Sequence, residues 1–402
     1  MNLWACPSAR EFMHDVCSLV RTSEQFVCLV LPDPHRAGFI EAFVRYADNY
    51  LGQVSVCTLA NTSTLDADFL ASFFPEILDA SLAISLASSG TSTYLLLTFP
   101  CDLDDSDGAC RAFLENLVQL AKERKKTGGI LLWRLIVVWP AHLPWPHGGE
   151  GLVVRFWWGQ LHPSDTEYAI EHCCREVYRD ELKEWEYLWL YSLCQGLAVM
   201  DPLLSLRIFQ ELPLDLEEIQ SLLADHPLMR VAPSIRQAIV RVDTQGASRL
   251  SRTEPPEGDI RTLWSIGALD IRENGLTALH PAAVCVANRI SSLEKLVVAG
   301  QIKVFFPIVQ EVHSFLCSQL RKVCGDCWHK KDKTFQNLND EIGGLPRYMS
   351  EYLKGQHDPD LYSLAVQWRN IRNSLAHGQS ISCRMAVDAC RLYGELRNRL
   401  QV

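Results

Sequence analysis

The chain has 402 residues, enough for two or three domains, and 48% of them are hydrophobic and 21% charged, a composition that excludes broad disorder. Its net charge of −10 argues against a nucleic-acid surface spread over the whole protein. The first residues contain no basic segment followed by a long apolar stretch, and no apolar run reaches the length of a membrane span, so we expect a cytoplasmic protein.

The first 160 residues alternate between short apolar runs and segments with helical periodicity. Apolar strands separated by amphipathic helices are typical of a mostly parallel sheet that is covered on both faces. We therefore predict an α/β three-layer domain over 1–160, either Rossmann-like or of a degenerate P-loop-like type. Strands are predicted at 26–31, 53–59, 94–99, 130–138 and 153–158, and helices at 38–51, 66–78 and 108–126.

The turn after the first predicted strand weakly resembles the phosphate-binding loop of P-loop NTPases. Alignment with G-x-x-x-x-G-K-[ST] keeps only Gly38. Asp33 stands at the first glycine, Phe39 at the lysine and Ile40 at the hydroxyl residue. Asp33 would repel phosphate, and Phe39 and Ile40 fit the buried face of a helix, so we expect no ATP hydrolysis. A ligand that is not hydrolysed stays compatible with this end of the sheet.

Residues 161–288 are predicted to be helical, with helices at 166–178, 181–200, 202–211 and 214–224 and a polar linker at 243–259. Asn274-Gly275 predicts a hairpin between apolar segments. Helices followed by a hairpin suggest a winged-helix module at about 200–285. Its acidic stretch at 203–224 favours packing or protein docking, and a DNA-binding regulator is the weaker alternative.

Residues 289–402 are predicted to form an all-α helical bundle, with helices at 290–323, 338–353, 360–376 and 382–400. Pro307 is expected to kink or split the first of them. This part carries 16 Lys and Arg against 11 Asp and Glu, so the basic balance of the chain lies here. Cys324, Cys327 and His329 have the spacing of zinc ligands, but no second C-x-x-C accompanies them, and buried thiols are the favoured interpretation.

The sequence Arg372-Asn373-Ser374-Leu375-Ala376-His377 contains an R-N-x-x-x-H motif at the end of a predicted helix, before Gly378. Arginine presents a planar set of donors that fits a phosphate. Histidine titrates near neutral pH and can exchange a proton with a ribose hydroxyl. These residue types predict phosphodiester chemistry, with Arg369 as a supporting RNA-binding residue.

This motif and the roughly 110 helical residues around it resemble the HEPN superfamily, whose catalytic members carry Arg, four to six residues and then His. The resemblance implies a homodimer with the two motifs facing each other, and metal-independent RNA cleavage. Arg372 would hold the scissile phosphate, His377 would act as general base or acid, and Asn373 would orient the arginine. On an ideal helix Arg372 and His377 point about 140° apart. They converge only if the helix unwinds at its end or if two subunits contribute.

The sequence thus predicts a metal-independent RNA endonuclease under the control of an N-terminal sensor or docking region, in a prokaryotic antiviral or toxin-like conflict system. RNA is the expected substrate, a second copy of the chain and a protein docked on the acidic N-terminal region are the expected partners, and no cofactor or metal is predicted. The alternative is a noncatalytic HEPN-like adaptor that dimerises or holds RNA within a larger complex.

Overall fold

The computed structural model describes residues 2–22, 26–36, 38–52, 54–58, 93–99, 109–126, 133–176, 182–212, 215–252, 254, 256–272, 274–325, 342–353 and 358–400. The helix predicted at 66–78, Cys327 and His329 lie outside these residues. Among the described residues, no helix is long and apolar enough to cross a membrane.

The chain divides into two compact units. Unit 1 comprises Met1–Ala169 and Arg230–Ala283, and unit 2 comprises Ile170–Met229 and Val284–Val402. Each unit is therefore built from two separate stretches of sequence, and the stretch 161–288 contributes to both. The three-domain division at 1–160, 161–288 and 289–402 stays a prediction.

Unit 1 contains the predicted parallel sheet, so the α/β expectation for the N-terminal part is confirmed. The five strands lie in the order β2-β3-β4-β1-β5. β1 is buried at every position and lies between β4 and β5, as a wholly apolar strand in a covered sheet should. The strands are β1 (Phe26–Leu31), β2 (Val54–Thr58), β3 (Thr93–Thr98), β4 (Trp133–Pro140) and β5 (Leu152–Phe156).

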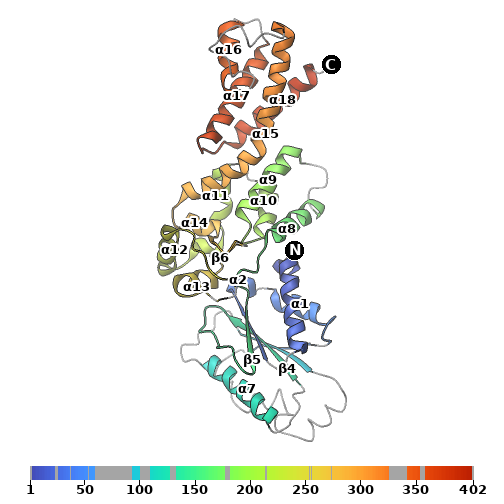
Figure 1. Cartoon of the computed structure of the whole chain (residues 1–402), viewed down its shortest axis with the longest axis vertical. Coiled ribbons are helices and arrows are strands. Elements are labelled where there is room, and N and C mark those ends of the chain that lie inside the picture. Colours follow the sequence, from blue (N-terminus) through green and yellow to red (C-terminus); the bar gives the residue numbers. More distant parts are fainter. Residues whose placement is uncertain are drawn as a thin grey trace. The chain divides into compact units, whose positions relative to one another are not determined.

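Helices lie on both faces of this sheet (Figure 1). α1 (Pro7–Thr22), which was not predicted, packs against β1 and α3 (Phe39–Ala47), and α7 (Ala109–Lys126) lies on the other side. Short helices η1 (Leu3–Ala5) and α2 (Asp33–Arg36) precede α1 and α3. Trp4 ties these elements together because its indole N–H donates to the His35 carbonyl at 2.9 Å and its ring contacts Phe39 and Trp157.

The connection from β4 to β5, residues 141–151, contains no helix. We call it the β4–β5 loop. Parallel strands are usually joined through a helix, but Pro144 and Pro146 disfavour one here. The loop lies against α7, since a Cβ at Gly151 would meet Val118 and Lys122 of that helix at 3.1 and 3.2 Å.

The second stretch of unit 1 holds α12 (Pro233–Gln245), α13 (Gly258–Ser265) and an antiparallel hairpin of β6 (Leu269–Ile271) and β7 (Thr277–Leu279). The predicted hairpin is therefore confirmed. Gly275 has φ +77°, which favours glycine, and the Asn274 side chain accepts the N–H of Leu276 at 3.0 Å. The predicted linker at 243–259 is shorter than expected, because α12 and α13 occupy its ends.

A buried carboxylate fixes the hairpin to the end of β5. Asp270 accepts the backbone N–H groups of Gly159 at 2.9 Å and of Ile271 at 2.8 Å. Arg252 donates to the Gly159 carbonyl through Nε at 2.9 Å. Burial raises the pKa of Asp270 to about 7, against the lowering effect of these N–H groups and of Arg252. This network joins segments that lie more than 90 residues apart in the sequence.

Unit 2 is helical, as predicted for the C-terminal part (Figure 1). Its longest helix, α15 (Ile290–Cys324), packs between α9 (Glu184–Leu197) and α17 (Pro359–Ala376) around Trp189, Phe305 and Trp368. The remaining helices of the described part are α10 (Leu204–Glu211), α11 (Leu216–Ala224), η6 (Ile342–Gly344), α16 (Leu345–Tyr352) and α18 (Cys383–Leu400). The boundaries between the two units fall within three helices: α8 (Pro163–Glu176), η3 (Pro227–Arg230) and α14 (Pro281–Val286).

Of the kink or split predicted at Pro307, the split is wrong, because α15 runs through this residue without a break, and the kink stays a prediction. A proline inside a helix removes one backbone donor. The turns on either side bury Val304, Phe305 and Val309, so packing holds the helix together across the missing hydrogen bond.

Candidate functional site

The R-N-x-x-x-H motif lies at the C-terminal end of α17, whose start and buried face are well defined. Asp358 caps the helix by accepting the N–H of Asp360 at 2.9 Å, and Pro359 occupies the first turn. Trp368, Ile371 and Leu375 are fully buried in the bundle. These side chains fix the rotation of α17, and with it the direction of the polar residues between them.

Arg372 and Asn373 are half-buried neighbours on this helix. Nη1 of Arg372 donates to Oδ1 of Asn373 at 3.1 Å. Arg369 makes the same kind of contact one turn earlier, with Nη2 donating to Oδ1 of Asn370 at 3.3 Å, but Asn370 is exposed. Asn373 is thus in contact with the guanidinium that the sequence marked as reactive.

His377 is exposed and stands at the first position beyond the helix. Gly378 has φ +73°, its N–H donates to the carbonyl of Leu375 at 3.0 Å, and Gln379 donates to Ser374 at 2.9 Å. This pair of bonds is a Schellman motif, so the predicted helix stop at Gly378 is confirmed. With φ −91° and ψ 5°, His377 departs from helical geometry, but its N–H still donates to the Asn373 carbonyl at 3.0 Å, so α17 does not unwind before this residue and helical spacing still separates it from Arg372.

Two side chains of α15 hold the turn that follows His377. Gln301 is buried, donates through Nε2 to the Ile381 carbonyl and accepts the Ile381 N–H through Oε1, both at 2.9 Å. Oε1 of Glu294 accepts from the N–H and from the hydroxyl of Ser380, both at 3.2 Å. Sequence reasoning missed both residues, because nothing in a helical pattern marks a glutamine whose partner lies 80 residues away.

The carboxyl ends of β1, β3 and β4 carry a second polar cluster. Nδ1 of His142 lies 3.0 Å from a carboxylate oxygen of Asp33, and Nη1 of Arg36 lies 3.6 Å from the other. Arg36 is buried and also donates to the Phe99 carbonyl. Among the described residues, its Nε and Nη1 have no hydrogen-bond partner. The positions aligned with a phosphate-binding loop are therefore engaged with one another.

Phe39, at the position of the P-loop lysine, is fully buried against Phe43 and Trp4, and Ile40 is half-buried. Both residues pack as the sequence indicated. A phosphate at this turn would meet the carboxylate of Asp33 and no lysine; the absence of ATP hydrolysis stays a prediction.

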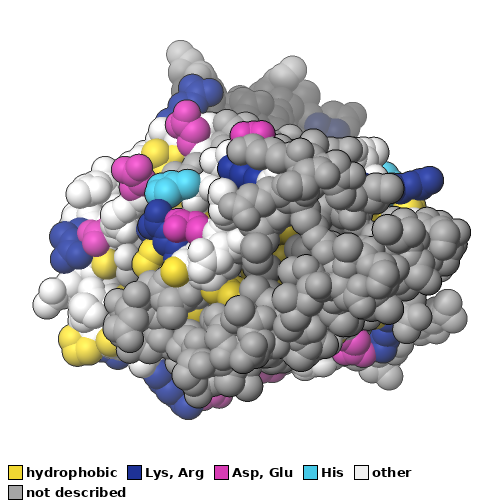
Figure 2. All heavy atoms as spheres, turned by 90° about the horizontal axis from the view of Figure 1, so that it is seen from below, with side chains coloured by type: hydrophobic (Ala, Val, Ile, Leu, Met, Phe, Trp, Pro, Cys, Tyr) yellow, Lys and Arg dark blue, Asp and Glu magenta, His cyan; other side chains and the backbone are white. Residues whose placement is uncertain are grey.

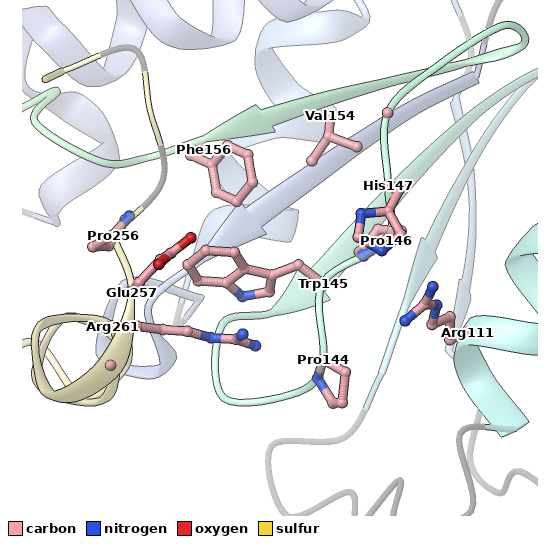
Figure 3. Close-up of a pocket in the computed structure, with 12 residues that line it drawn as sticks. Arg111, Pro144, Trp145, Pro146, His147, Val154, Phe156, Pro256, Glu257 and Arg261 are labelled. Atoms are coloured by element: carbon pink, nitrogen blue, oxygen red, sulfur yellow. The ribbon is translucent and has the colours of Figure 1, made fainter.

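A pocket of about 550 Å³ lies in unit 1 between the β4–β5 loop, β5 and the first turns of α7 and α13 (Figure 3). The guanidinium of Arg261 lies 3.9 Å from the ring centre of Trp145, and its Nη2 donates to the Leu143 carbonyl at 2.6 Å. The pocket is lined by Arg111, Pro144, Trp145, Pro146, His147, Gly148, Val154, Phe156, Pro256, Glu257, Gly258 and Arg261. Sequence analysis did not single out this pocket.

The cysteines weighed as metal ligands are in part described. Cys317 and His313 are buried on α15, with Sγ and Nε2 3.4 Å apart. Burial raises the pKa of the Cys317 thiol to about 11, which opposes the thiolate form that zinc requires. Cys324 ends α15 and is half-buried.

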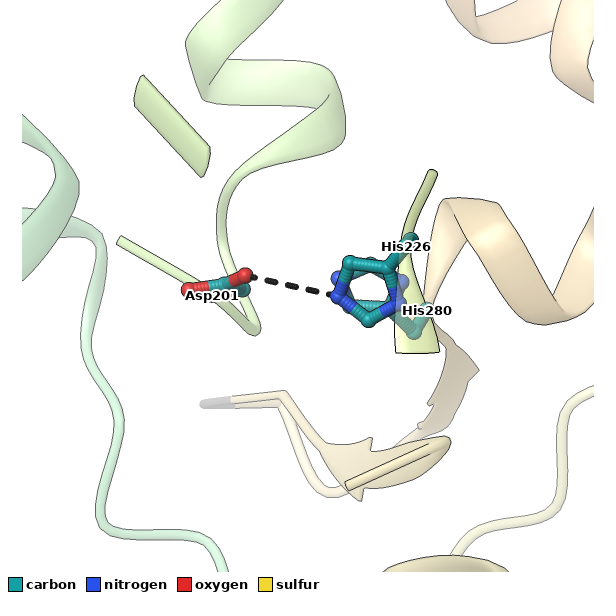
Figure 4. A group of neighbouring side chains, drawn as sticks. All are labelled: Asp201, His226 and His280. Atoms are coloured by element: carbon teal, nitrogen blue, oxygen red, sulfur yellow. Dashed lines mark ion pairs between the residues drawn. The ribbon is translucent and has the colours of Figure 1, made fainter. Parts of the chain in front are cut away.

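A histidine and an aspartate of unit 2 form a long ion pair, with Nε2 of His226 3.9 Å from Oδ2 of Asp201 (Figure 4). Both side chains also bind backbone N–H groups nearby: Asp201 accepts from Leu203 at 3.1 Å and Nδ1 of His226 accepts from Leu228 at 3.3 Å. Bonds from a backbone N–H to a side chain two residues earlier stabilise turns. The pair therefore has a structural account within unit 2.

On the face drawn in Figure 2, Lys and Arg side chains of the described residues lie beside Asp and Glu side chains. Arg111–Glu115 and Arg45–Glu41 are exposed ion pairs of unit 1.

No protein-family model matches this chain, and no curated protein matches it. Among solved structures, the chain is similar to that of the ORC2 protein of Aeropyrum pernix in ADPNP–ADP complexes, with 10% sequence identity and a TM-score of 0.30. The similarity covers 70% of this chain and 92% of that chain. At this TM-score the likeness says nothing about function.

Proposed function

We propose that the protein is a metal-independent RNA endonuclease of HEPN type, with Arg372 and His377 as catalytic residues and Asn373 as a positioning residue. The observation that carries the proposal is the end of α17. There, a half-buried guanidinium is hydrogen-bonded to a neutral amide, one turn before an exposed imidazole on an anchored turn. The Asn373 amide orients the guanidinium, and a guanidinium presents several N–H donors that fit a phosphate.

The chemistry needs only these groups and the RNA. His377 as a neutral imidazole takes the proton of a ribose 2′-hydroxyl, and the resulting oxygen attacks the adjacent phosphorus. Arg372 donates to the nonbridging oxygens while negative charge develops on them. The P–O5′ bond breaks, the leaving oxygen takes up a proton from a protonated imidazole, and the products are a 2′,3′-cyclic phosphate and a 5′-hydroxyl.

The proposal includes a homodimer, because one motif supplies one imidazole and the reaction uses a base and an acid. Two copies of His377 facing each other would supply both roles. In this proposal unit 1 senses or docks a partner and controls the nuclease, and the setting is a cytoplasmic antiviral or toxin-like system of prokaryotes. The residues before Arg289 carry a net negative charge and those from Arg289 on a net positive charge, which favours RNA at the C-terminal part.

The test is cleavage of end-labelled single-stranded RNA in the presence of EDTA, with the full chain and two variants. Arg372→Ala and His377→Ala should each lower the cleavage rate by at least about 100-fold. Arg384→Ala is the matched control, because it removes an arginine that is 94% exposed on the neighbouring helix, and it should cleave at the parent rate.

Mass spectrometry of the fragments should find the cyclic phosphate. Cleavage that survives both substitutions would contradict the proposal that Arg372 and His377 cleave RNA. RNA that is bound by the dimer and cleaved by neither the parent nor the variants would contradict it as well. The second outcome would instead support the noncatalytic adaptor that holds RNA.

A further inference from the structure

The pocket beside Trp145 is bordered by the β4–β5 loop, which contains no helix although parallel strands are usually joined through one. The pocket of about 550 Å³ lies between this loop, the first turn of α7 and the first turn of α13 (Figure 3). A cavity of this size, lined by aromatic rings and a few charged groups, has the features of a small-molecule site.

One side of the pocket is suited to a planar ring. Trp145 is fixed by its indole N–H, which donates to the Ala141 carbonyl at 2.8 Å, and by edge contacts with Phe156 and Trp264. The Arg261 guanidinium lies along the indole at 3.9 Å, so a planar cation is already held in position. Aromatic rings and stacked guanidinium planes are the surfaces on which proteins hold unpaired bases.

The opposite side of the pocket is suited to an anion. Arg111 extends from the first turn of α7 and lies beside His147 in Figure 3. Its hydrogen bond to Glu115 uses Nε, at 2.9 Å, and among the described residues no hydrogen bond involves its two Nη atoms. The ion pair with Glu115 is exposed and therefore weak, so Arg111 can turn its Nη donors to a phosphate.

We propose that this pocket binds a nucleotide unit, with the base against Trp145 and Arg261 and the phosphate at Arg111 and His147. The carboxylate of Glu257 on the pocket wall can accept a hydrogen bond from a ribose hydroxyl or an exocyclic amine. The site is distinct from the turn after β1, where Asp33 and Arg36 pair with each other. A free nucleotide and the end of an RNA strand share this chemistry. The RNA is titrated into the Arg372→Ala/His377→Ala chain, in which the proposed nuclease site neither holds nor cuts it, so the result does not depend on the proposed nuclease.

The experiment is isothermal titration of the full chain with AMP, GMP, CMP and UMP, with adenosine, with inorganic phosphate and with a 5′-phosphorylated tetranucleotide RNA. At least one nucleotide should bind more tightly than its nucleoside and than phosphate, because base and phosphate contacts add. A tetranucleotide that binds at least tenfold more tightly than any mononucleotide identifies a strand end, and equal affinities identify a free nucleotide.

Arg111→Ala should weaken nucleotide binding about tenfold and leave nucleoside binding unchanged. Arg261→Gln should weaken both. Arg45→Ala is the matched control, because Arg45 also pairs with a glutamate four residues away but lies outside the pocket, and it should bind like the parent. Absence of binding at millimolar nucleotide, equal affinities in Arg111→Ala and the parent, or capture of an acidic peptide in place of nucleotides would overturn the proposal.

Discussion

The carboxyl ends of β1 and β4 in unit 1 and the carboxyl end of α17 in unit 2 each bring an arginine and a histidine to a surface turn. In unit 1 both groups lie on one carboxylate, since His142 is 3.0 Å and Arg36 3.6 Å from Asp33. In unit 2 Nη1 of Arg372 donates to the neutral amide oxygen of Asn373 at 3.1 Å. A carboxylate brings a negative charge to the cation it positions, whereas the Asn373 amide positions the guanidinium without adding a charge.

The two regions also differ in how their polar groups are buried. The Arg36 side chain is 4% exposed and Asp270 is buried, so these charged groups of unit 1 serve the packing of strands and loops. At the end of α17 in unit 2, a buried polar group that holds the turn after His377 is the uncharged Gln301. The carboxylate of Glu294 holds the same turn through Ser380.

Replacing the amide beside Arg372 by a carboxylate should have the largest effect on RNA cleavage. Asn373→Asp places a carboxylate against Arg372 and copies the Asp33–Arg36 arrangement, so RNA cleavage should fall about 100-fold because the anion competes with phosphate. Asn370→Asp is the matched control, since it changes the partner of Arg369 in the same way, and cleavage should change less than threefold. Single-turnover rates measure both; equal losses in the two variants would mean that charge alone, and not position, matters.

The anchoring of the helix end is tested by Gln301→Leu. The leucine leaves the N–H and carbonyl of Ile381 without their partners, so the free energy of unfolding should fall by about 3 kcal/mol. Ile302→Ala, at the neighbouring exposed position of α15, should cost less than about 1 kcal/mol. Urea denaturation measures both. A Gln301→Leu variant as stable as the parent would show that the turn after His377 does not depend on this bond.

A glycine in unit 1 tests whether its interior is as constrained as its polar groups suggest. Gly159 has φ +64° and a Cβ there would meet Ile271 at 2.8 Å, while Gly52 has φ +82° and open space around it. Gly159→Ala should therefore cost about 3 kcal/mol, and Gly52→Ala about 1 kcal/mol from backbone strain alone. The difference between the two, measured by denaturant titration, isolates the steric contact; similar values would place β6 farther from Gly159.

The elements that could be predicted from the sequence are those whose signal is local. Six consecutive apolar residues before Pro32 indicated β1, and Asn274-Gly275 indicated the turn between β6 and β7. α12 was missed because its buried stripe consists only of Ala238, Ile239 and Val242, too few to show a period. α1 carries a clear apolar stripe and was simply not assigned.

The strand order and most of the candidate sites depend on pairings between distant segments. β1 lies between β4 and β5, which begin more than 100 residues later, and no local pattern encodes that choice. The motif residues Arg372 and His377 were visible because they lie on one helix end. Gln301, Asp270 and the ring of residues around Trp145 were not, because their roles come from partners that only the fold brings near.

The buried carboxylate of Asp270 in unit 1 predicts a pH dependence of stability. Burial raises the pKa of Asp270 to about 7 from its ordinary value near 4, so between these values the folded chain holds a proton that the unfolded chain releases. Stability from this group is complete at low pH and is lost as the pH rises toward 7. Asp270→Asn removes the titration, so the decrease in Tm between pH 5 and pH 8 should be a few degrees smaller than in the parent. Calorimetry measures Tm in both proteins. Equal decreases in the parent and the variant would mean that the N–H groups of Gly159 and Ile271, together with Arg252, already hold the Asp270 carboxylate ionised at neutral pH.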